Sequence, residues 1–375
     1  MNSYDCIVLG TGGIGSATLY HLAKRGLNVL GIDRHPPGHD RGSSHGDTRI
    51  IRLVYMEHPD YVPLLRRAYE LWGALEEQSK ARLFVESGLL QVGPAAGVVI
   101  RGVRESAALH NLPVEELTPK DAMERFPGWK IDEDHVGMYE ARAGYLHVER
   151  CVQAHAEAAR QLGADLVSGE EVRTWESLGD GVRVTTDSAT YSAARLVVTA
   201  GAWAGALLAD LNLPLIVRRK PVFWYATDND AYKVENGAPT FFFETDVGLF
   251  YGFPQIDRRG LKVAEHSGGE TVVDPLAVDR ELSPRDRGPV EGFLRRYMPA
   301  VSAQVTRHSV CMYTLTPDEH FLVGIHPEAT HVAFVAGLSG HGFKFATVLG
   351  EVLADFTTTG TTTHPVDFLS PRRFA

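Results

Sequence analysis

The chain has 375 residues, of which 44% are hydrophobic and 22% are charged, and its formal net charge is −10. This length suits two domains, and the composition is that of an ordinary globular protein. The negative charge and the lack of a basic stripe interleaved with aromatic residues argue against nucleic-acid binding. No apolar run is long enough to span a membrane and no basic segment precedes the first one, so we expect a cytoplasmic protein without a targeting signal.

Cysteine and histidine usage argues against disulfide and metal chemistry. The three cysteines are too few and too scattered for a disulfide framework, and they suit a reducing compartment. Three of the 16 histidines, His35, His39 and His45, lie in one loop. No H-x-x-x-H pair on a predicted helix and no C-x-x-C pair accompanies them. We therefore predict no metal site.

The most informative stretch is the turn Gly10-Thr11-Gly12-Gly13-Ile14-Gly15. It lies between a predicted strand at residues 5–9 and a predicted helix at residues 16–25. A second predicted strand, at residues 28–32, ends at the acid Asp33. This is the G-x-G-x-x-G dinucleotide-binding fingerprint with the strand, helix and acid that it requires.

Each position of the fingerprint has a physical role. Gly10 permits the tight turn, Gly12 lets the backbone approach a pyrophosphate, and Gly15 lets the helix lie close to the sheet. The free N–H groups at the helix start attract the diphosphate, and Asp33 can accept hydrogen bonds from a ribose. The motif predicts an adenine dinucleotide and leaves NAD, NADP and FAD open.

After the fingerprint, the sequence predicts a long loop and then a mixture of strands and helices. Residues 34–49 are a long polar loop without helical or strand periodicity, and such loops tend to be functional. The basic cluster at residues 218–220 is interpreted as a solvated strand end or loop. The other predicted elements are strands at 82–85, 88–92, 164–167, 182–186, 190–192, 196–203 and 332–336, alternating strands between 221 and 313, and helices at 63–79, 148–162 and 345–356.

A second glycine-rich turn, residues 337–344, favours FAD over NAD. It connects a predicted strand to a predicted helix, so backbone N–H groups and a positive dipole end point out of that helix. Reduced flavin carries negative charge near N1 and C2=O, which such a helix end stabilises, whereas a nicotinamide has no need of it. The alternative is a tight loop packed against the core.

Four segments carry a resemblance to a known family: residues 44–52, 311–314, 316–318 and 340–344. In combination they resemble the monomeric sarcosine oxidase and N-methyltryptophan oxidase family, and the similarity runs over nearly the whole chain. The resemblance implies FAD-dependent oxidation of an N-methyl or cyclic secondary amino acid, with O2 reduced to H2O2. The imine product would then hydrolyse. It also implies a monomer.

The fold that this resemblance implies is α/β, or α+β overall. A glutathione-reductase-like, Rossmann-type FAD domain would comprise residues 1–80, 145–220 and 320–375. A second domain built on an antiparallel sheet would comprise residues 81–144 and 221–319 and would carry the substrate.

The resemblance also implies roles for individual residues. Cys311 would hold the flavin through its 8α-methyl group, and a lone thiol suits this chemistry because a thiolate can add to that carbon. Arg52 and Lys344 would bind the substrate carboxylate. Lys262 would stabilise the charge that develops on O2. The remaining positions are Arg49 and His45 near the flavin ring, His266, Tyr313, Tyr251 and Phe242 in the substrate pocket, and, for the cofactor, Gly10, Gly12, Gly13, Ile14, Gly15, Asp33, Arg34, Ser43, Thr48, Val172, Gly201, Trp203, Gly340, Gly342, Phe343 and Lys344.

One departure leaves the substrate open. Phe242 and Phe250 make the predicted pocket strongly aromatic, which favours larger N-methyl amino acids or cyclic imino acids over sarcosine. Three alternatives to the amine oxidase share part of the evidence. They are an FAD-dependent dehydrogenase or deglycating oxidase, an NAD-dependent dehydrogenase, and a nucleotide-binding module without turnover.

Overall fold

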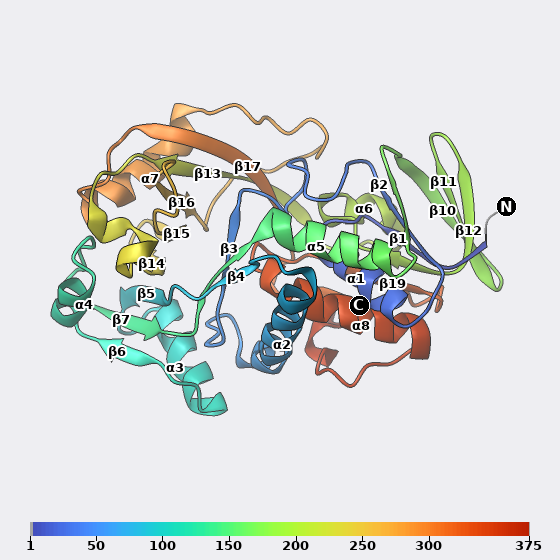
Figure 1. The fold of residues 1–375 in the computed structure, drawn as a ribbon, viewed down its shortest axis with the longest axis horizontal. Coiled ribbons are helices and arrows are strands. Elements are labelled where there is room, and N and C mark those ends of the chain that lie inside the picture. The colour runs from blue at the N-terminus through green and yellow to red at the C-terminus, as the bar shows by residue number, and fades with distance from the viewer. Residues whose placement is uncertain (1–2, 375) are drawn as a thin grey trace.

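The computed structural model of the chain describes residues 3–374, which fold into two eight-stranded sheets and one three-stranded sheet (Figure 1). The two large sheets lie side by side in Figure 1, with the strands of the small sheet between them. The small sheet pairs β3 with β8 and β8 with β4, and its strands are β3 (Thr48–Ile51), β4 (Phe84–Val85) and β8 (Gly144–His147).

The first sheet has a parallel centre with β1 in the middle. Its order is β10-β11-β12-β1-β2-β9, and β19 pairs with both β12 and β18. The pairs β1–β2, β1–β12, β2–β9 and β12–β19 are parallel, as expected of a dinucleotide-binding sheet. The strands are β1 (Ser3–Leu9), β2 (Val29–Asp33), β9 (Asp165–Ser168), β10 (Val172–Leu178), β11 (Gly181–Thr186), β12 (Thr190–Val198), β18 (Leu322–Ile325) and β19 (Val332–Ala336).

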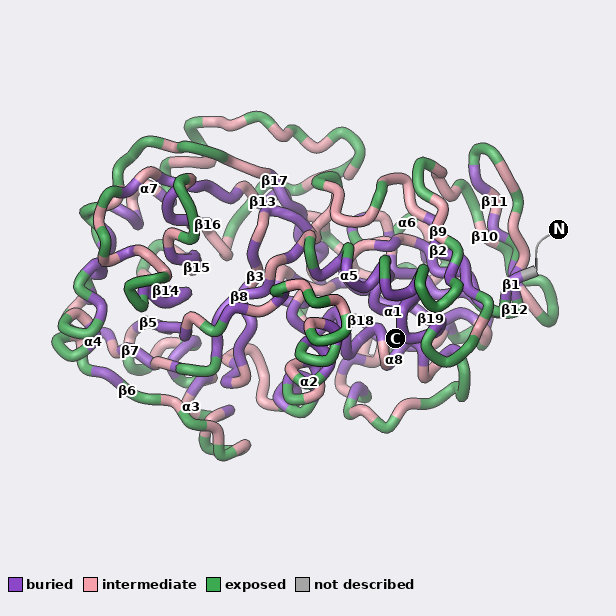
Figure 2. The backbone as a smooth tube through the Cα atoms, in the orientation of Figure 1, coloured by how far each residue is buried: buried purple, intermediate pink, exposed green. Residues whose placement is uncertain are grey.

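Helices cover this sheet and bury its centre. Figure 2 shows β1, β19 and α1 buried, whereas the turn between β10 and β11 is exposed. Helix α1 packs against both α5 and α8. A Cβ on Gly350 of α8 would lie 2.7 Å from the Ala17 carbonyl carbon, so this glycine is needed for the close α1–α8 contact. The helices are α1 (Gly13–Lys24), α2 (Val62–Ser79), α5 (Val148–Gln161), α6 (Ala204–Leu207) and α8 (Ala346–Thr359).

The second sheet is antiparallel except for the parallel pair β5–β14, and its order is β17-β13-β16-β15-β14-β5-β7-β6. One face packs against α7, where the Phe250 and Phe293 rings stack 4.7 Å apart. The elements are β5 (Leu89–Pro94), β6 (Glu115–Leu117), β7 (His135–Glu140), β13 (Ile216–Tyr225), β14 (Thr240–Thr245), β15 (Gly248–Phe253), β16 (Leu261–Glu265), β17 (Val305–Leu315), α3 (Val98–His110), α4 (Pro119–Arg125) and α7 (Pro284–Tyr297).

The predicted strands and helices of the first sheet are found in place, with shifted ends. Helix α1 begins at Gly13 instead of residue 16. The polar loop ends before Thr48, because Thr48 pairs with His147 in the small sheet. Helices α3 and α7 were not predicted. The division into two domains stays a prediction, and its boundary at residue 220 falls within β13.

Two sequence interpretations were wrong. Arg219 and Lys220 are not solvated: they lie inside β13 and are 6% and 4% exposed. Phe250 does not line a pocket. In the β14–β15 ladder it pairs with Phe243 on the face that meets α7, whereas the next pair, Phe242 with Tyr251, lies on the opposite face.

Candidate active site

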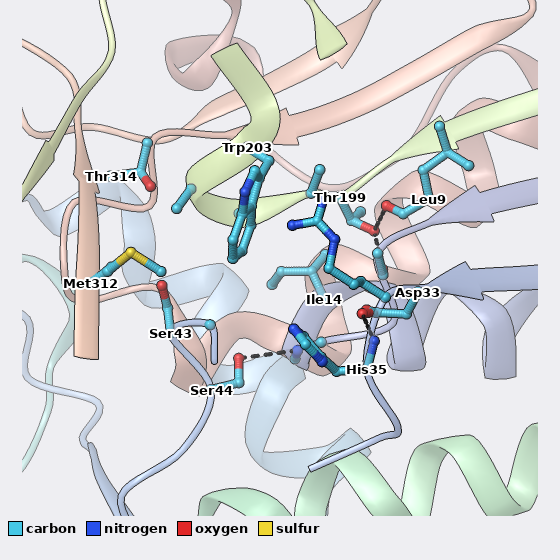
Figure 3. Close-up of a pocket in the computed structure, with 18 of the residues that line it drawn as sticks. Leu9, Ile14, Asp33, His35, Ser43, Ser44, Thr199, Trp203, Met312 and Thr314 are labelled. Atoms are coloured by element: carbon cyan, nitrogen blue, oxygen red, sulfur yellow. Dashed lines mark hydrogen bonds between the residues drawn. The ribbon is translucent and has the colours of Figure 1, made fainter. Parts of the chain in front are cut away.

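A cavity of about 440 Å³ opens at the carboxyl ends of the parallel strands, where open α/β sheets bind their ligands (Figure 3). Leu9 at the end of β1, Asp33 at the end of β2 and Ala336 at the end of β19 all line it. Met312, within β17 of the second sheet, lines the opposite side. The volume lies within the range of about 300–1,000 Å³ typical of ligand sites.

Two glycines of the fingerprint turn, Gly10 and Gly15, are sterically required. Gly10 has a φ of +84°, and a Cβ there would lie 2.8 Å from the Thr199 carbonyl oxygen. A Cβ on Gly15 would lie 1.7 Å from the Gly10 carbonyl oxygen, so α1 could not approach the turn with any other residue. The Gly13 N–H at the helix start donates to Ser44 Oγ at 3.1 Å. The backbone therefore forms the kind of cradle that a diphosphate requires.

The polar groups of this cavity also fit a dinucleotide. Asp33 is fixed by two backbone N–H groups, those of Thr11 at 2.6 Å and His35 at 2.9 Å. Two buried donors, Arg34 Nε and Trp203 Nε1, have no partner within residues 3–374. Unpartnered donors in the wall of a large cavity fit a polar ligand.

Most predicted cofactor residues line this cavity, and four do not. Gly15 lies beneath the turn, Lys344 lines a second cavity, and Thr48 and Cys311 line neither of the two. The thirteen that line the large cavity are Gly10, Gly12, Gly13, Ile14, Asp33, Arg34, Ser43, Val172, Gly201, Trp203, Gly340, Gly342 and Phe343.

A second, smaller cavity of about 40 Å³ adjoins the first. The two share four wall residues, Arg49, Tyr313, Gly340 and Phe343. Gly340 has a φ of +81°, and a Cβ there would lie 2.3 Å from the Tyr313 ring, so only glycine allows the ring this position. A volume of this size holds about three water molecules, and therefore suits a very small ligand.

One end of the small cavity is cationic. Arg52 is 3% exposed and pairs with Glu57, whose carboxylate oxygens lie 2.7 and 2.6 Å from Arg52 Nη2. Lys344 Nζ donates to the His341 carbonyl oxygen at 2.7 Å. Burial, and then the neighbouring charge of Arg52, lower the pKa of Lys344 to about 7.

Aromatic side chains from the second sheet form the other wall. The Tyr313 hydroxyl lies 3.4 Å from the Tyr251 hydroxyl and 3.5 Å from His266 Nδ1. The Phe242 ring lies 5.6 Å from that of His266. Burial, and then the charge of Lys220, lower the pKa of His266 to about 3, so the imidazole is neutral at physiological pH.

Cys311 lies beside the side chains of Arg49 and His45. Its sulfur is 3.2 Å from Arg49 Nη2 and 3.9 Å from His45 Nδ1. Burial opposes ionisation of this thiol, but the His45 and Arg49 charges outweigh it and lower its pKa to about 6. Burial raises the pKa of the thiols of Cys6 and Cys151 instead. Cys311 is therefore a thiolate at neutral pH.

Lys262 is a buried cation next to this group. It is 2% exposed, and its Nζ donates to the carbonyl oxygens of Gly46 and Thr48, at 2.5 and 3.0 Å, and to Thr48 Oγ1 at 3.1 Å. Burial, and then the Arg49 charge, lower the pKa of Lys262 to about 7. Thr48 thus holds Lys262 in place instead of lining the cofactor cavity.

Comparison with known proteins identifies the family. The sequence matches the family described as "FAD dependent oxidoreductase" over residues 5–356. The chain belongs to this family. It is 40% identical to a monomeric sarcosine oxidase of Streptomyces avermitilis (100% of this chain, 98% of the relative) and 40% identical to an N-methyl-L-tryptophan oxidase of Yersinia pestis (94% of each). The structure of NikD, an unusual amino acid oxidase essential for nikkomycin biosynthesis, superposes with a TM-score of 0.88 at 28% identity, covering 99% and 98% of the two chains.

These similarities confirm three predictions drawn from the sequence of this FAD-dependent oxidoreductase: the family resemblance, the fold class and the flavoprotein oxidase class. Membership in this family identifies the cofactor as FAD and not NAD. It also excludes the interpretation as a nucleotide-binding module without turnover, because the relatives are oxidases.

Sequence reasoning missed several buried groups of the oxidoreductase. Glu57 contacts Arg52 and Tyr55 contacts Lys344, and His341 joins them through a 2.6 Å hydrogen bond to the Tyr55 hydroxyl. Glu140 accepts from the N–H groups of the two residues after Arg52. Glu57 could have been found from the sequence, because it is an acid only five residues after Arg52. Nothing in the local sequence pattern distinguishes Glu140.

The predicted absence of a metal stays a prediction. Asp132, Asp134 and His135 have donor atoms within 4.8 Å of one another, although none of the three lines either cavity. Asp132 Oδ2 already accepts from Arg296 and Tyr297.

Among the described residues, no helix is long and apolar enough to cross a membrane.

Proposed function

We propose that this oxidoreductase oxidises a small N-methyl or secondary amino acid, of the size of sarcosine, to an imine that hydrolyses, while O2 is reduced to H2O2. The observation that carries the proposal is the small cavity with two buried cations, Arg52 and Lys344, at one end. This cavity meets the dinucleotide cavity across Arg49, Tyr313, Gly340 and Phe343.

The size of the small cavity favours a small substrate. Its volume of about 40 Å³ is far closer to the size of a small amino acid than to that of an amino acid that carries an indole or a sugar. The relatives at 40% identity include enzymes named for sarcosine and for N-methyl-L-tryptophan, so their names leave both sizes open. Phe242, whose ring lies 5.7 Å from the Arg52 guanidinium carbon, restricts the space further.

The side chains of the small cavity would bind and orient the substrate. Arg52 can grip both oxygens of a carboxylate, and Lys344 adds a second charge. The amine must lose its proton before it is oxidised, and the cations Arg49, Arg52 and Lys344 favour the neutral amine. Bound FAD would accept the equivalent of a hydride, two electrons and one proton, from the carbon next to the nitrogen, where the C–N bond becomes C=N. Lys262 would then favour the negative charge that develops on O2.

We further propose that Cys311 bonds covalently to the 8α-methyl group of FAD. Its low pKa supports this role, because the thiolate is the reactive form of a cysteine. Its neighbours Met312 and Tyr313 line the dinucleotide cavity. Formation of the thioether from the thiolate releases two electrons and one proton, and O2, the acceptor of the oxidase reaction, takes these up with a second proton from water to form H2O2.

The test begins with the colour of the purified protein. After acid precipitation we expect a yellow pellet from the wild type and a colourless pellet from Cys311→Ser. A peroxide-coupled assay then compares sarcosine, N-methyl-L-tryptophan, pipecolate, proline and a fructosyl amino acid. We expect the highest kcat/KM for sarcosine and a large loss in Arg52→Ala. Oxidation of none of the five would refute the proposal.

A second candidate is the same oxidation with an acceptor other than O2, or with a fructosyl amino acid as donor. The buried Lys262 favours O2, and the small cavity disfavours the sugar. An assay with an artificial dye in the absence of O2 separates the first case. The monomeric state and the cytoplasmic location stay predictions.

A further inference from the structure

Lys220 is a buried cation that lies behind the aromatic wall of the small cavity, and the proposed reaction does not use it. It lies on β13, opposite Cys311 in the antiparallel ladder with β17, and Arg218 on the same strand lies opposite Tyr313. Residues that lie opposite each other in such a ladder share a face of the sheet. Lys220 is 4% exposed, so its charge is held inside the protein.

All three protons of the Lys220 ammonium are used by one turn of the backbone. Nζ donates to the carbonyl oxygens of His266, Ser267 and Gly268, each at 2.7 Å. Within residues 3–374 no carboxylate lies within ion-pair distance of this nitrogen. A buried lysine without an anionic partner is destabilising unless its hydrogen bonds are complete, as they are here.

The turn is shaped around the lysine. Gly268 and Gly269 have φ values of +67° and +96°, which favour glycine. A Cβ on Gly269 would lie 2.6 Å from the Arg219 carbonyl oxygen and 3.3 Å from Lys220 Cε. The two glycines therefore bring three carbonyl oxygens to one point, next to the strand that carries Lys220.

The same lysine also contacts the aromatic wall of the small cavity. Nζ lies 5.0 Å from the centroid of the Tyr313 ring, a cation–π distance. The turn begins at His266, whose ring lies 5.6 Å from that of Tyr313 and whose Nδ1 lies 3.5 Å from the Tyr313 hydroxyl. Lys220 thus joins the backbone of one pocket residue to the ring of another.

We propose that Lys220 is a positioning residue, which fixes the 266–268 turn and the Tyr313 ring so that His266 and Tyr313 keep the substrate pocket in its binding geometry. This inference rests on the proposed function, because it assigns His266 and Tyr313 to the amino acid site. Lys220 itself lines neither cavity, so it acts through these two residues.

The charges that face Lys220 come from three segments. Burial is the largest influence and lowers its pKa to about 8, Glu265 of β16 and Glu319 after β17 raise the pKa, and Arg218 lowers it. The neutral amine retains only two protons for three carbonyl oxygens. We therefore expect the turn to lose protection as the pH rises through about 8, before the protein as a whole is affected.

The test compares Lys220→Met, which removes the charge and keeps an unbranched side chain of nearly the same length, with Lys120→Met on α4, a lysine that is 82% exposed. We expect the KM for sarcosine to rise on the order of 10- to 100-fold in Lys220→Met, while the rate at which the reduced enzyme reacts with O2 stays within about twofold. Hydrogen–deuterium exchange of the peptide that covers residues 261–273 provides a readout that does not depend on turnover. This peptide should exchange faster in Lys220→Met, and its loss of protection between pH 7 and 9 in the wild type should be absent.

The outcomes separate this inference from the proposed function. If the wild type oxidises no secondary amino acid, the proposed function fails, whereas the exchange experiment still tests the hold on the turn. If the wild type is active and Lys220→Met matches it in both KM and exchange, the positioning role is refuted. A fall in kcat and in the melting temperature with an unchanged KM would also refute it, because it would indicate a purely structural lysine. Lys120→Met should match the wild type throughout.

Discussion

One guanidinium nitrogen of Arg52, Nη2, donates to both carboxylate oxygens of Glu57, at 2.7 and 2.6 Å. Burial opposes ionisation of Glu57, but the charges of Arg52, His341 and Lys344 lower its pKa to about 2. The Glu57 carboxylate is therefore already bound to Arg52, the side chain that we propose binds the substrate carboxylate. A substrate carboxylate must replace it, and the ion pair competes with binding.

Glu57→Gln should strengthen the binding of amino acids while it weakens the fold. Loss of the negative charge leaves Arg52 buried without an ion pair, and we expect a destabilisation of about 1–3 kcal/mol. A substrate carboxylate would restore the pair, so the KM for sarcosine should fall several-fold. Steady-state kinetics and thermal melts with and without acetate measure the two effects, and Glu70→Gln on the exposed face of α2 is the control.

The contribution of the Glu57–Arg52 ion pair to the free energy of unfolding should depend on pH. Because its folded pKa is lowered from 4.5 to about 2, Glu57 stabilises the wild type above pH 4.5, and this contribution is lost as the pH falls toward 2. Glu57→Gln should lack that part of the acid transition. An unchanged acid transition together with a raised KM would contradict the competition.

Lys262→Met should impair only the reaction with O2. We expect the oxidation of the reduced enzyme to slow on the order of 10²- to 10³-fold, since one positive charge next to the developing anion is lost. Reduction by the amino acid should change little. In the wild type the O2 rate should fall as the pH rises through about 7, where Lys262 loses its proton, and the variant should show no such step. Stopped-flow absorbance resolves both half-reactions, with Lys233→Met as the control.

The covalent link to Cys311 should depend on pH through the thiolate. When apoprotein is mixed with FAD, we expect the rate of linkage to rise with pH and to level off above about 6. In His45→Asn the midpoint should move to higher pH, because His45 is the leading positive influence on this thiol. Acid-precipitable flavin, sampled over time, measures the rate. Equal midpoints in the two proteins would disprove the role of His45.

The parts of the site that sequence reasoning found are those in which local sequence determines geometry. The fingerprint glycines and Asp33 could be assigned because a turn, a helix start and a strand end follow one another along the chain. Arg52 and Lys344 are far apart in sequence and come close only in the folded protein, so they could be assigned to one site only through the family resemblance. Lys220 was misjudged because a charge cluster normally faces water, and the carbonyl oxygens that surround it come from the turn after β16, far away in sequence. Phe250 was misplaced because the face of a strand residue depends on register, which the sequence does not state.

Gln91 is a buried amide without partners. It lies on β5, is 0% exposed, and neither its Oε1 nor its Nε2 has a hydrogen-bond partner within the described part of the chain. In the sheet it lies opposite Phe242 and Met138, which belong to one apolar cluster on the pocket side. An unsatisfied buried amide destabilises a protein, and a side chain of the same shape without polar atoms removes that penalty.

Gln91→Met should therefore stabilise the protein by about 1–3 kcal/mol. Urea unfolding measured at neutral pH gives the free energy of unfolding directly. Gln78→Met is the matched control, because Gln78 Oε1 accepts a 2.7 Å hydrogen bond from Tyr20, and its loss should be neutral or slightly destabilising. If Gln91→Met is instead the less stable variant, the amide is satisfied by an internal water, and the cluster next to Phe242 is not dry.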